Sequence, residues 1–363
     1  MCTFVKKMIA MKKLFHLTVA LLPLLVLAGG CGLPDPGQQI YTAIAGVYMI
    51  EGGTPTTPAI LSHLDYNTRS VTRDIFRQQN GKSLTGRVPD ALSFGNHLCI
   101  CAQDAGVVYV TDLFGKIERE ISAAEQGANQ PSHIILEKEN LFVTYADGFL
   151  ARIDTATFTV TVLTLPDKPQ GLAASNNQIF VACPGATGFG TTIAVVEARS
   201  FAAMKSMSVS TNPSELVACG KSYLYVLFKG ANSGIEVFDT EKNESLATVG
   251  VQSPIAISTG YSSYFFALTR ETDGAGNIYQ RIVPVDGYTA RPEMQDLNRG
   301  DVILDSAVTI SVDPINGMIF VGSTKEDGSG KYEIFTPQGG LWHTLNTTET
   351  PGKVFFATTQ VVY

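Results

Sequence analysis

Histidine is scarce in this chain, and the few copies are scattered. Five occur among 363 residues, and the four beyond residue 30 are His63, His97, His133 and His343. None belongs to an HxH or HExxH pattern, so the sequence predicts no metal site and no catalytic histidine. The glycine-rich stretch 184–192 is not followed by Gly-Lys-Ser/Thr, so it predicts a flexible loop rather than a phosphate cradle.

Cysteine offers no disulfide framework. Beyond residue 31 the cysteines are Cys99, Cys101, Cys183 and Cys219. The first two are two positions apart on one expected strand and point the same way, which is a poor geometry for a bridge. Cys99 is better read as a small core hydrophobe.

Charged residues are also few, and their net charge is negative, which is unfavourable for binding nucleic acid. Charged residues make up 16% of the chain, with 26 basic against 33 acidic residues. Four of the lysines lie within residues 1–30, which leaves the remainder with a net charge of −11. This balance argues against nucleic acid or an anionic membrane surface as a partner.

Long apolar runs are missing except near the start, where residues 14–27 follow Lys12-Lys13. The run is shorter than the roughly 20 residues of a spanning helix, so it predicts a secretory signal. The Ala-Gly-Gly at 28–30 followed by Cys31 resembles a bacterial lipoprotein box, although the usual leucine lies one place further back, at Leu27. An ordinary signal peptide with a chance cysteine is the alternative, and either Met1 or Met11 could start the chain.

These features predict three segments: a lipoprotein signal peptide over 1–30, a tether over 31–43 and one domain over 44–363. Cys31 would be the lipidated first residue of the mature protein. Two prolines and two glycines lie within 32–37, as in a short linker. The predicted location is the outer membrane, with the protein lipid-anchored and facing either the surface or the periplasm.

A short sequence motif recurs along the rest of the chain at roughly 40-residue spacing. Each copy has a proline, then about ten residues, then an apolar–aromatic–apolar step. The prolines are Pro89, Pro131, Pro169, Pro213, Pro254 and Pro351. The steps occupy 98–100, 141–143, 179–181, 224–226 and 264–266, with two more at 47–49 and 319–321. A period of this length with short strands predicts a β-propeller.

The unit that starts at Pro169 divides into four expected strands, at 171–174, 178–182, 192–197 and 201–209. Pro351 opens a copy with too little chain left to finish a blade. Residues 44–77 offer strands at 47–50, 61–66 and 70–76 without an opening proline. We therefore predict an all-β, seven-bladed propeller of four-stranded antiparallel blades, closed by pairing of the N- and C-terminal strands. Six or eight blades, or an evenly spaced β-sandwich, are the alternatives.

In such a ring, the loop that leads into each innermost strand lies on the same face as the loop between the second and third strands. Loops of this kind commonly carry binding function. The candidate ligand-binding residues on this face are Tyr145, Phe189, Lys229, Arg270, Asp90, His133, Gln170 and Glu215. A solvated loop residue is the plain alternative for each of them.

The Tyr-Val-Thr-Asp run at 109–112 and the Val-Phe-Asp-Thr run at 237–240 resemble YVTN-type propellers. The segments 51–53, 80–84 and 351–353 further resemble seven-bladed propeller lipoproteins of Bacteroidetes envelopes. The resemblance covers about residues 45–356 and departs at 306–308, where the last full blade lacks its proline. Within that family, one group captures cobalamin at the cell surface and passes it to a TonB-dependent outer-membrane transporter.

The resemblance thus implies a non-enzymatic lipoprotein that captures a small ligand on its loop face, with cobalamin as candidate and a TonB-dependent transporter as possible partner. No cofactor is predicted. An envelope protein–protein interaction scaffold is the alternative, and a lactonase-like enzyme is a further one. A quinone-cofactor propeller would be expected to carry repeated tryptophans, whereas this chain has one, Trp342.

Overall fold

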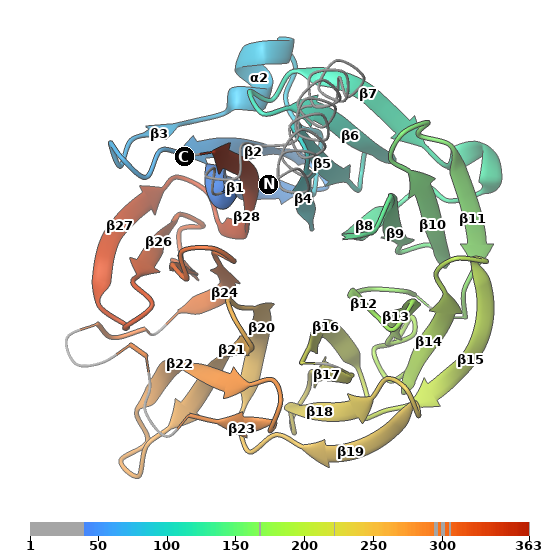
Figure 1. The fold of residues 1–363 in the computed structure, drawn as a ribbon. Helices are drawn as coiled ribbons and strands as arrows, with labels where there is room; N and C mark the ends of the chain where they lie inside the picture. Colours follow the sequence, from blue (N-terminus) through green and yellow to red (C-terminus); the bar gives the residue numbers. More distant parts are fainter. Residues whose placement is uncertain are drawn as a thin grey trace, which may run out of the picture. The chain divides into compact units, whose positions relative to one another are not determined.

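Seven four-stranded sheets are arranged in a ring (Figure 1). The computed structural model describes residues 40–362 except 167, 221, 294–296, 299–301 and 305. The description below concerns the unit Thr42–Thr359. The predicted signal peptide, most of the predicted tether and Cys31 lie outside the described residues. Strand β1 begins at Ile40, within the range assigned to the tether.

The first three blades are numbered in chain order. Blade 1 contains, from the centre of the ring outward, β28 (Pro351–Val362), β1 (Ile40–Thr54), β2 (Thr57–Leu64) and β3 (Val71–Thr72). Blade 2 contains β4 (Ala91–Phe94), β5 (His97–Ala102), β6 (Val107–Asp112) and β7 (Ile117–Ser122). Blade 3 contains β8 (Pro131–Glu137), β9 (Asn140–Tyr145), β10 (Phe149–Asp154) and β11 (Val160–Thr164).

The other four blades follow the same order. Blade 4 contains β12 (Leu172–Ser175), β13 (Gln178–Cys183), β14 (Thr192–Glu197) and β15 (Ala202–Ser208). Blade 5 contains β16 (Pro213–Cys219), β17 (Tyr223–Phe228), β18 (Gly234–Asp239) and β19 (Glu244–Thr248). Blade 6 contains β20 (Pro254–Thr259), β21 (Tyr264–Thr272), β22 (Ile278–Asp286) and β23 (Arg291–Pro292). Blade 7 contains β24 (Ala307–Val312), β25 (Ile319–Thr324), β26 (Gly330–Phe335) and β27 (Leu341–Thr347).

The predicted fold class is confirmed, including the closure of the ring. The C-terminal strand β28 is the innermost strand of blade 1 and pairs with β1. Tyr332 of blade 7 ties this junction, because its hydroxyl donates to the carbonyl of Ile50 at 2.8 Å. Closure gives blade 1 its fourth strand, so β1 has a neighbouring strand on both sides.

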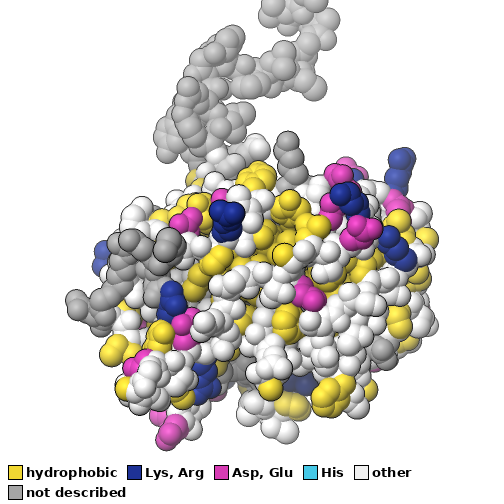
Figure 2. Space-filling model, turned by 90° about the horizontal axis from the view of Figure 1, so that it is seen from below, with side chains coloured by type: hydrophobic (Ala, Val, Ile, Leu, Met, Phe, Trp, Pro, Cys, Tyr) yellow, Lys and Arg dark blue, Asp and Glu magenta, His cyan; other side chains and the backbone are white. Residues whose placement is uncertain are grey.

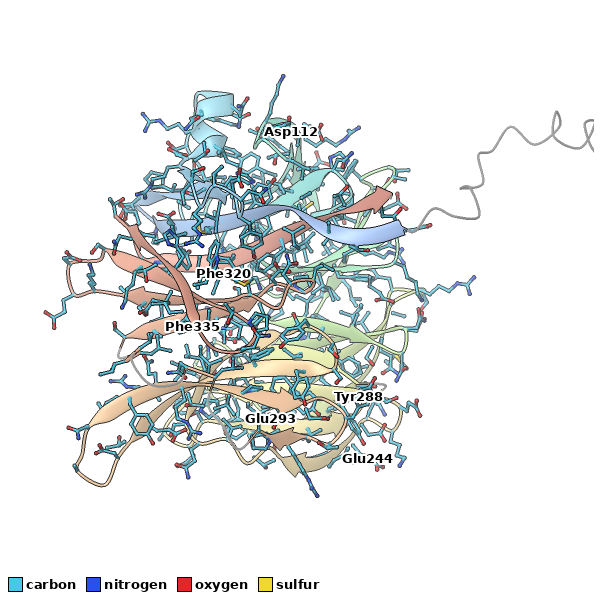
Figure 3. All side chains as sticks on the ribbon, turned by 60° about the vertical axis from the view of Figure 1, so that its left-hand side comes forward. Asp112, Glu244, Tyr288, Glu293, Phe320 and Phe335 are labelled. Atoms are coloured by element: carbon cyan, nitrogen blue, oxygen red, sulfur yellow. The ribbon has the colours of Figure 1, made fainter. Side chains whose placement is uncertain are left out.

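Both faces of each blade are buried, which explains the apolar–aromatic–apolar step. In β9, Leu141 and Val143 pack in a cluster with blade 2, whereas Phe142 packs in a cluster with blade 4. Successive side chains of a strand point to opposite faces, so a second strand held between two neighbouring blades needs apolar residues at every position. Figure 3 shows Phe320 and Phe335 of blade 7 inside this layered packing.

Blade 7 keeps the backbone of the repeat without its proline. The pairing register shifts between Pro213 and Glu215 in blade 5 and between Pro254 and Ala256 in blade 6. The same shift occurs between Ala307 and Thr309 in blade 7. Ala307 therefore occupies the position of the missing proline, and the bulge does not depend on the proline ring.

One predicted strand is wrong. Residues 70–76 were expected to form a strand, but β3 covers only Val71–Thr72 and Phe76 lies in the short helix α2 (Ile75–Asn80). The Asp74 carboxylate accepts a hydrogen bond from the backbone N–H of Arg77 and so starts the helix. Phe76 is fully buried and packs on Tyr109, with ring centroids 5.2 Å apart. A second short element is the 3-10 turn η1 (Ala124–Gln126).

Candidate functional site

The leading loops, which precede the innermost strands, lie beside the loops between second and third strands. The N–H of Ala146 donates to the carbonyl of Gln130 at 2.8 Å, and the N–H of Lys229 donates to that of Asn212 at 3.0 Å. In blade 6, the N–H of Arg270 donates to the carbonyl of Ser253 at 3.0 Å. These bonds place both sets of loops on one face, which we call the mouth face.

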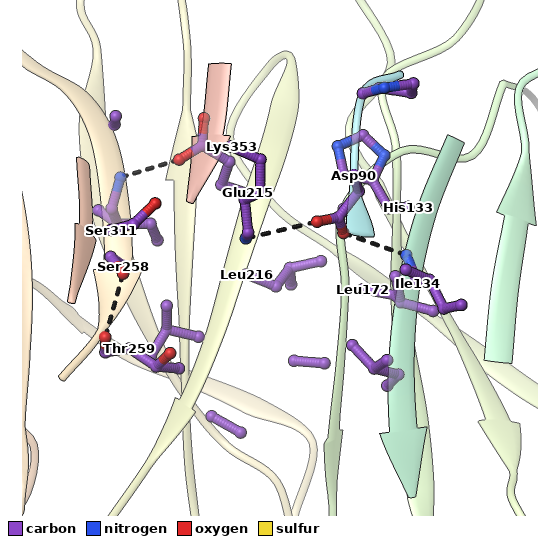
Figure 4. Close-up of a pocket in the computed structure, with 18 of the residues that line it drawn as sticks. Asp90, His133, Ile134, Leu172, Glu215, Leu216, Ser258, Thr259, Ser311 and Lys353 are labelled. Carbon is purple, nitrogen blue, oxygen red and sulfur yellow. Dashed lines mark hydrogen bonds and ion pairs between the residues drawn. The ribbon is translucent and has the colours of Figure 1, made fainter. Parts of the chain in front are cut away.

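A cavity of about 470 Å³ opens at the centre of the ring (Figure 4). Its wall is formed by consecutive residues of the innermost strands β8, β12, β16, β20 and β24. Charged side chains that line it include Asp90, Glu215 and Lys353, and His133 lies beside them. The volume is within the range of small-molecule sites, which is about 300–1,000 Å³.

Glu215 joins two blades at this cavity. One carboxylate oxygen accepts a hydrogen bond from the backbone N–H of Ile257 in blade 6 at 2.8 Å. The other contacts the ammonium of Lys229 at 2.8 Å. The backbone bond holds the carboxylate in place, while the side chain of Lys229 is 43% exposed and is held by a surface ion pair.

Asp90 has the same arrangement between blades 2 and 3. Its Oδ2 accepts a hydrogen bond from the backbone N–H of Ile134 at 3.1 Å. Its Oδ1 lies 3.4 Å from the ammonium of Lys353, which comes from β28 in blade 1. The Asp90 side chain is 11% exposed and that of Lys353 is 44% exposed, so again the carboxylate is the fixed partner.

Both carboxylates use a recurring donor. Ile134 and Ile257 each lie three residues after the proline of their blade, as does Val354, whose N–H donates to the hydroxyl of Ser311 at 3.3 Å. An innermost strand has no further strand on the side of the ring centre, so this N–H needs a partner from outside its own blade. The preceding blade supplies the acceptor in each of these three cases.

His133 lies close enough to both ion pairs to interact with their charges, and it is half-buried. Its Nδ1 is 2.9 Å from the hydroxyl of Ser132. Burial lowers the pKa of His133, while Asp90 and Glu215 act to raise it and Lys353 and Lys229 act to lower it. A neutral imidazole can both donate and accept a hydrogen bond at the mouth.

The structure brings together four of the eight predicted residues: Asp90, His133, Glu215 and Lys229. A fifth predicted residue, Gln170, lies two positions before β12, the innermost strand of blade 4. Its backbone N–H bonds to Ala182 at 2.8 Å, and its carbonyl accepts from the Thr144 hydroxyl at 2.9 Å.

The other three are separate from this group. Tyr145 is fully buried in the cluster between blades 2 and 3, where burial raises the pKa of its hydroxyl, so it cannot meet a ligand on the surface. Phe189 is 77% exposed in the loop after β13. Arg270 was expected in a loop but lies in β21, because β21 and β22 form a long hairpin that pairs Arg270 with Gln280.

Lys353 and the wall hydroxyls were not among the predicted ligand-binding residues. Lys353 follows the last proline by two residues and reaches Asp90 only because the ring closes. Ser258, Thr309 and Ser311 line the blade 6 and blade 7 side of the cavity. All three lie two to four residues after the first residue of an innermost strand. The spacing from the start of each repeat could therefore have predicted that they line the cavity.

The described residues form neither a metal-binding cluster nor a membrane-spanning helix. Within them, no group of three or more His, Cys, Asp or Glu side chains is arranged to hold a metal ion. No described helix is long and apolar enough to cross a membrane. A second cavity of about 520 Å³ lies between blades 3 and 4, lined by residues that include Lys138, Phe142 and Arg199.

Comparison with known proteins supports the fold alone. No protein-family description matches the sequence, and no curated protein does. Among solved structures, hydrazine synthase of Kuenenia stuttgartiensis is similar over 76% of this chain and 96% of its own, with 13% identity and a TM-score of 0.60. AztD of Citrobacter koseri covers 88% of this chain and 99% of its own, with 11% identity and a TM-score of 0.57.

A third similar structure is a quinonprotein alcohol dehydrogenase-like protein from Bacteroides thetaiotaomicron. It covers 87% of this chain and 79% of its own, with 14% identity and a TM-score of 0.60. The names of these three proteins indicate different functions, so the shared propeller fold does not assign an activity to this chain. The fold is compatible with ligand binding or with an interaction scaffold.

Proposed function

We propose that this chain is a non-enzymatic binding protein that captures a small polar ligand at the mouth of its central cavity. The observation that carries the proposal is the pair of fixed carboxylates, Asp90 and Glu215, at one cavity of about 470 Å³. Each holds an exposed lysine that a ligand can displace at little cost, because surface ion pairs contribute about 0–1 kcal/mol. The wall supplies the hydrogen-bonding groups that would orient the ligand.

We further propose that the protein is lipid-anchored at Cys31 in the outer membrane, as a member of the Bacteroidetes propeller lipoproteins. The residues at 28–31 and the resemblance at 51–53, 80–84 and 351–353 support this assignment. In that family, capture proteins work beside a TonB-dependent transporter. Cobalamin is the specific ligand that the resemblance suggests.

Isothermal calorimetry tests the ligand directly. The chain from Gly32 onward is titrated with cyanocobalamin, and a panel of small polar ligands is screened by thermal shift. Glu215→Gln should weaken any ligand held at the mouth. The matched control is Lys242→Met, which removes a lysine that is 68% exposed in the turn between β18 and β19. If micromolar cyanocobalamin gives no binding heat, cobalamin is excluded as the ligand. If no compound of the panel shifts the melting temperature, the ligand-capture proposal is wrong.

An interaction scaffold is the second candidate, and exposed apolar residues favour it. Figure 2 views the rim at blades 5 and 6 and shows apolar side chains gathered among scattered charges. Leu246, Ile278 and Tyr288 are 49%, 49% and 54% exposed on these blades. A cross-linking experiment on envelope membranes would favour the scaffold if a partner is captured through this rim and the triple serine variant of these positions abolishes it.

A further inference from the structure

Two ion pairs of the same design face one cavity from different blades. Asp90 of blade 2 contacts Lys353, and Glu215 of blade 5 contacts Lys229. Figure 4 shows Asp90, His133, Glu215 and Lys353 around the opening, with Leu172 and Leu216 deeper along the wall. The two carboxylates at the cavity therefore lie three blades apart, and each has an ammonium group beside it.

The two signs of charge are held differently. Each carboxylate is fixed by a backbone N–H of the next blade, at 3.1 Å for Asp90 and 2.8 Å for Glu215. Each lysine has an exposed side chain that can turn away without breaking a backbone contact. A ligand cation can thus take the place of an ammonium at a fixed carboxylate. The displaced ammonium is then free to contact a ligand anion.

A ligand with only one kind of charge gains less. A cation would leave the displaced lysine in solvent, and an anion would draw the lysine away from a carboxylate that then loses its partner. A ligand with both an ammonium and a carboxylate gives the fixed carboxylate a new cation and gives the displaced lysine a new anion. The arrangement of the mouth therefore favours a zwitterion.

The wall adds a second preference. The innermost strands pair with their own blade on one side only, so alternate N–H and C=O groups on the other side point toward the cavity. These edges can pair with an extended backbone, as in strand addition. Between them, Leu172, Ala174, Leu216 and Ala218 give the wall an aliphatic side that suits small apolar side chains.

We propose that the mouth binds short peptides with free termini. The N-terminal ammonium occupies one fixed carboxylate, the C-terminal carboxylate engages a displaced lysine, and the peptide backbone bonds to a strand edge. This inference rests on the proposed capture at the mouth and names the ligand from the chemistry of the mouth. A cavity of about 470 Å³ has room for a ligand of about three small residues.

Calorimetry with tri-alanine tests the inference, using the chain from Gly32 onward. N-acetyl-tri-alanine and tri-alanine amide each remove one terminal charge and leave the size nearly unchanged. N-acetyl-tri-alanine should bind at least about tenfold more weakly than the free peptide, since it loses a charged hydrogen bond to a fixed carboxylate. Tri-alanine amide should bind more weakly by up to about fivefold, since it loses an ion pair to an exposed lysine. Lys353→Met and Glu215→Gln should each weaken the free peptide, whereas Lys242→Met should not.

Several outcomes overturn the inference. Equal binding of free and blocked peptides would show that the termini are not recognised, and absence of binding by any peptide would remove the ligand class. If peptides fail while other ligands shift the melting temperature, capture at the mouth stands and only the peptide is lost. Should Glu215→Gln fail to fold, Lys353→Met still decides, because its side chain reaches the site from an exposed position.

Discussion

The two acids at the cavity and the acids in the turns of the opposite face are held in different ways. On the face opposite the mouth, the turn between the third and fourth strands has an acid in six blades, namely Asp65, Asp112, Asp154, Glu197, Asp239 and Asp286. Each accepts N–H groups from two to four residues later in its own turn. On the mouth face, Asp90 and Glu215 accept N–H groups from residues 44 and 42 positions away.

The difference separates local from long-range structure. A turn acid satisfies the backbone of its own loop, which is a short-range preference of Asp in turns. A mouth acid joins two blades, because it accepts the N–H of a buried residue of the next blade, Ile134 or Ile257. Acidic side chains therefore hold single turns on the opposite face and join two blades at the cavity.

The largest expected effect comes from removing a mouth acid. Asp90→Ala leaves the buried N–H of Ile134 without its acceptor and should lower the free energy of unfolding by about 2 kcal/mol, measured by urea denaturation. Asp90→Asn keeps an acceptor oxygen and should cost clearly less. Equal losses for the two variants would contradict the role given to this bond.

Low pH should reduce the stability that the turn aspartates of the opposite face contribute together. Hydrogen bonds from turn N–H groups lower the pKa of Asp65, Asp154, Asp239 and Asp286. Their stabilisation is complete above the unfolded pKa of about 4 and is lost as the pH falls through the lower folded pKa values. Thermal unfolding between pH 5 and pH 2 should show a steady fall in melting temperature. A flat profile in this range would refute the contribution of these turns.

A single turn acid should matter less than Asp90. Asp154 accepts from the N–H groups of Ala156 and Thr157 and from the Thr157 hydroxyl, all in an exposed turn. Asp154→Ala exposes these donors to water, so the urea midpoint should fall by less than in Asp90→Ala. The comparison between faces fails if the turn variant is the more damaging of the two.

The smallest expected effect concerns His133. Burial lowers its pKa, so the unfolded chain takes up a proton more readily than the folded one. Stability from this group is present above the unfolded pKa of about 6.5 and is lost as the pH falls through the folded pKa. His133→Gln should flatten part of the loss between pH 7 and pH 5. Burial also lowers the pKa of His63, so the part of the stability loss that comes from His63 should remain in this variant.

Much of the architecture could be read from the chain. The repeated proline and apolar step indicated the blades, because strands buried on both faces need apolar residues at each position. Phe76 was misplaced, because a short helix capped by Asp74 has no extended 3.6-residue pattern. Tyr145 was assigned to the ligand face because it ends a strand beside a loop, yet its ring turns into the cluster between two blades.

The sequence by itself determined the number of blades and the face on which the leading loops lie. These features depend on residues close together in the chain. Only the tertiary structure decided that Asp90 meets Ile134 and Lys353, and that Glu215 meets Ile257 and Lys229. Asp90 and Lys353 are 263 positions apart in the chain but become neighbours when the ring closes, and no local pattern encodes such a contact.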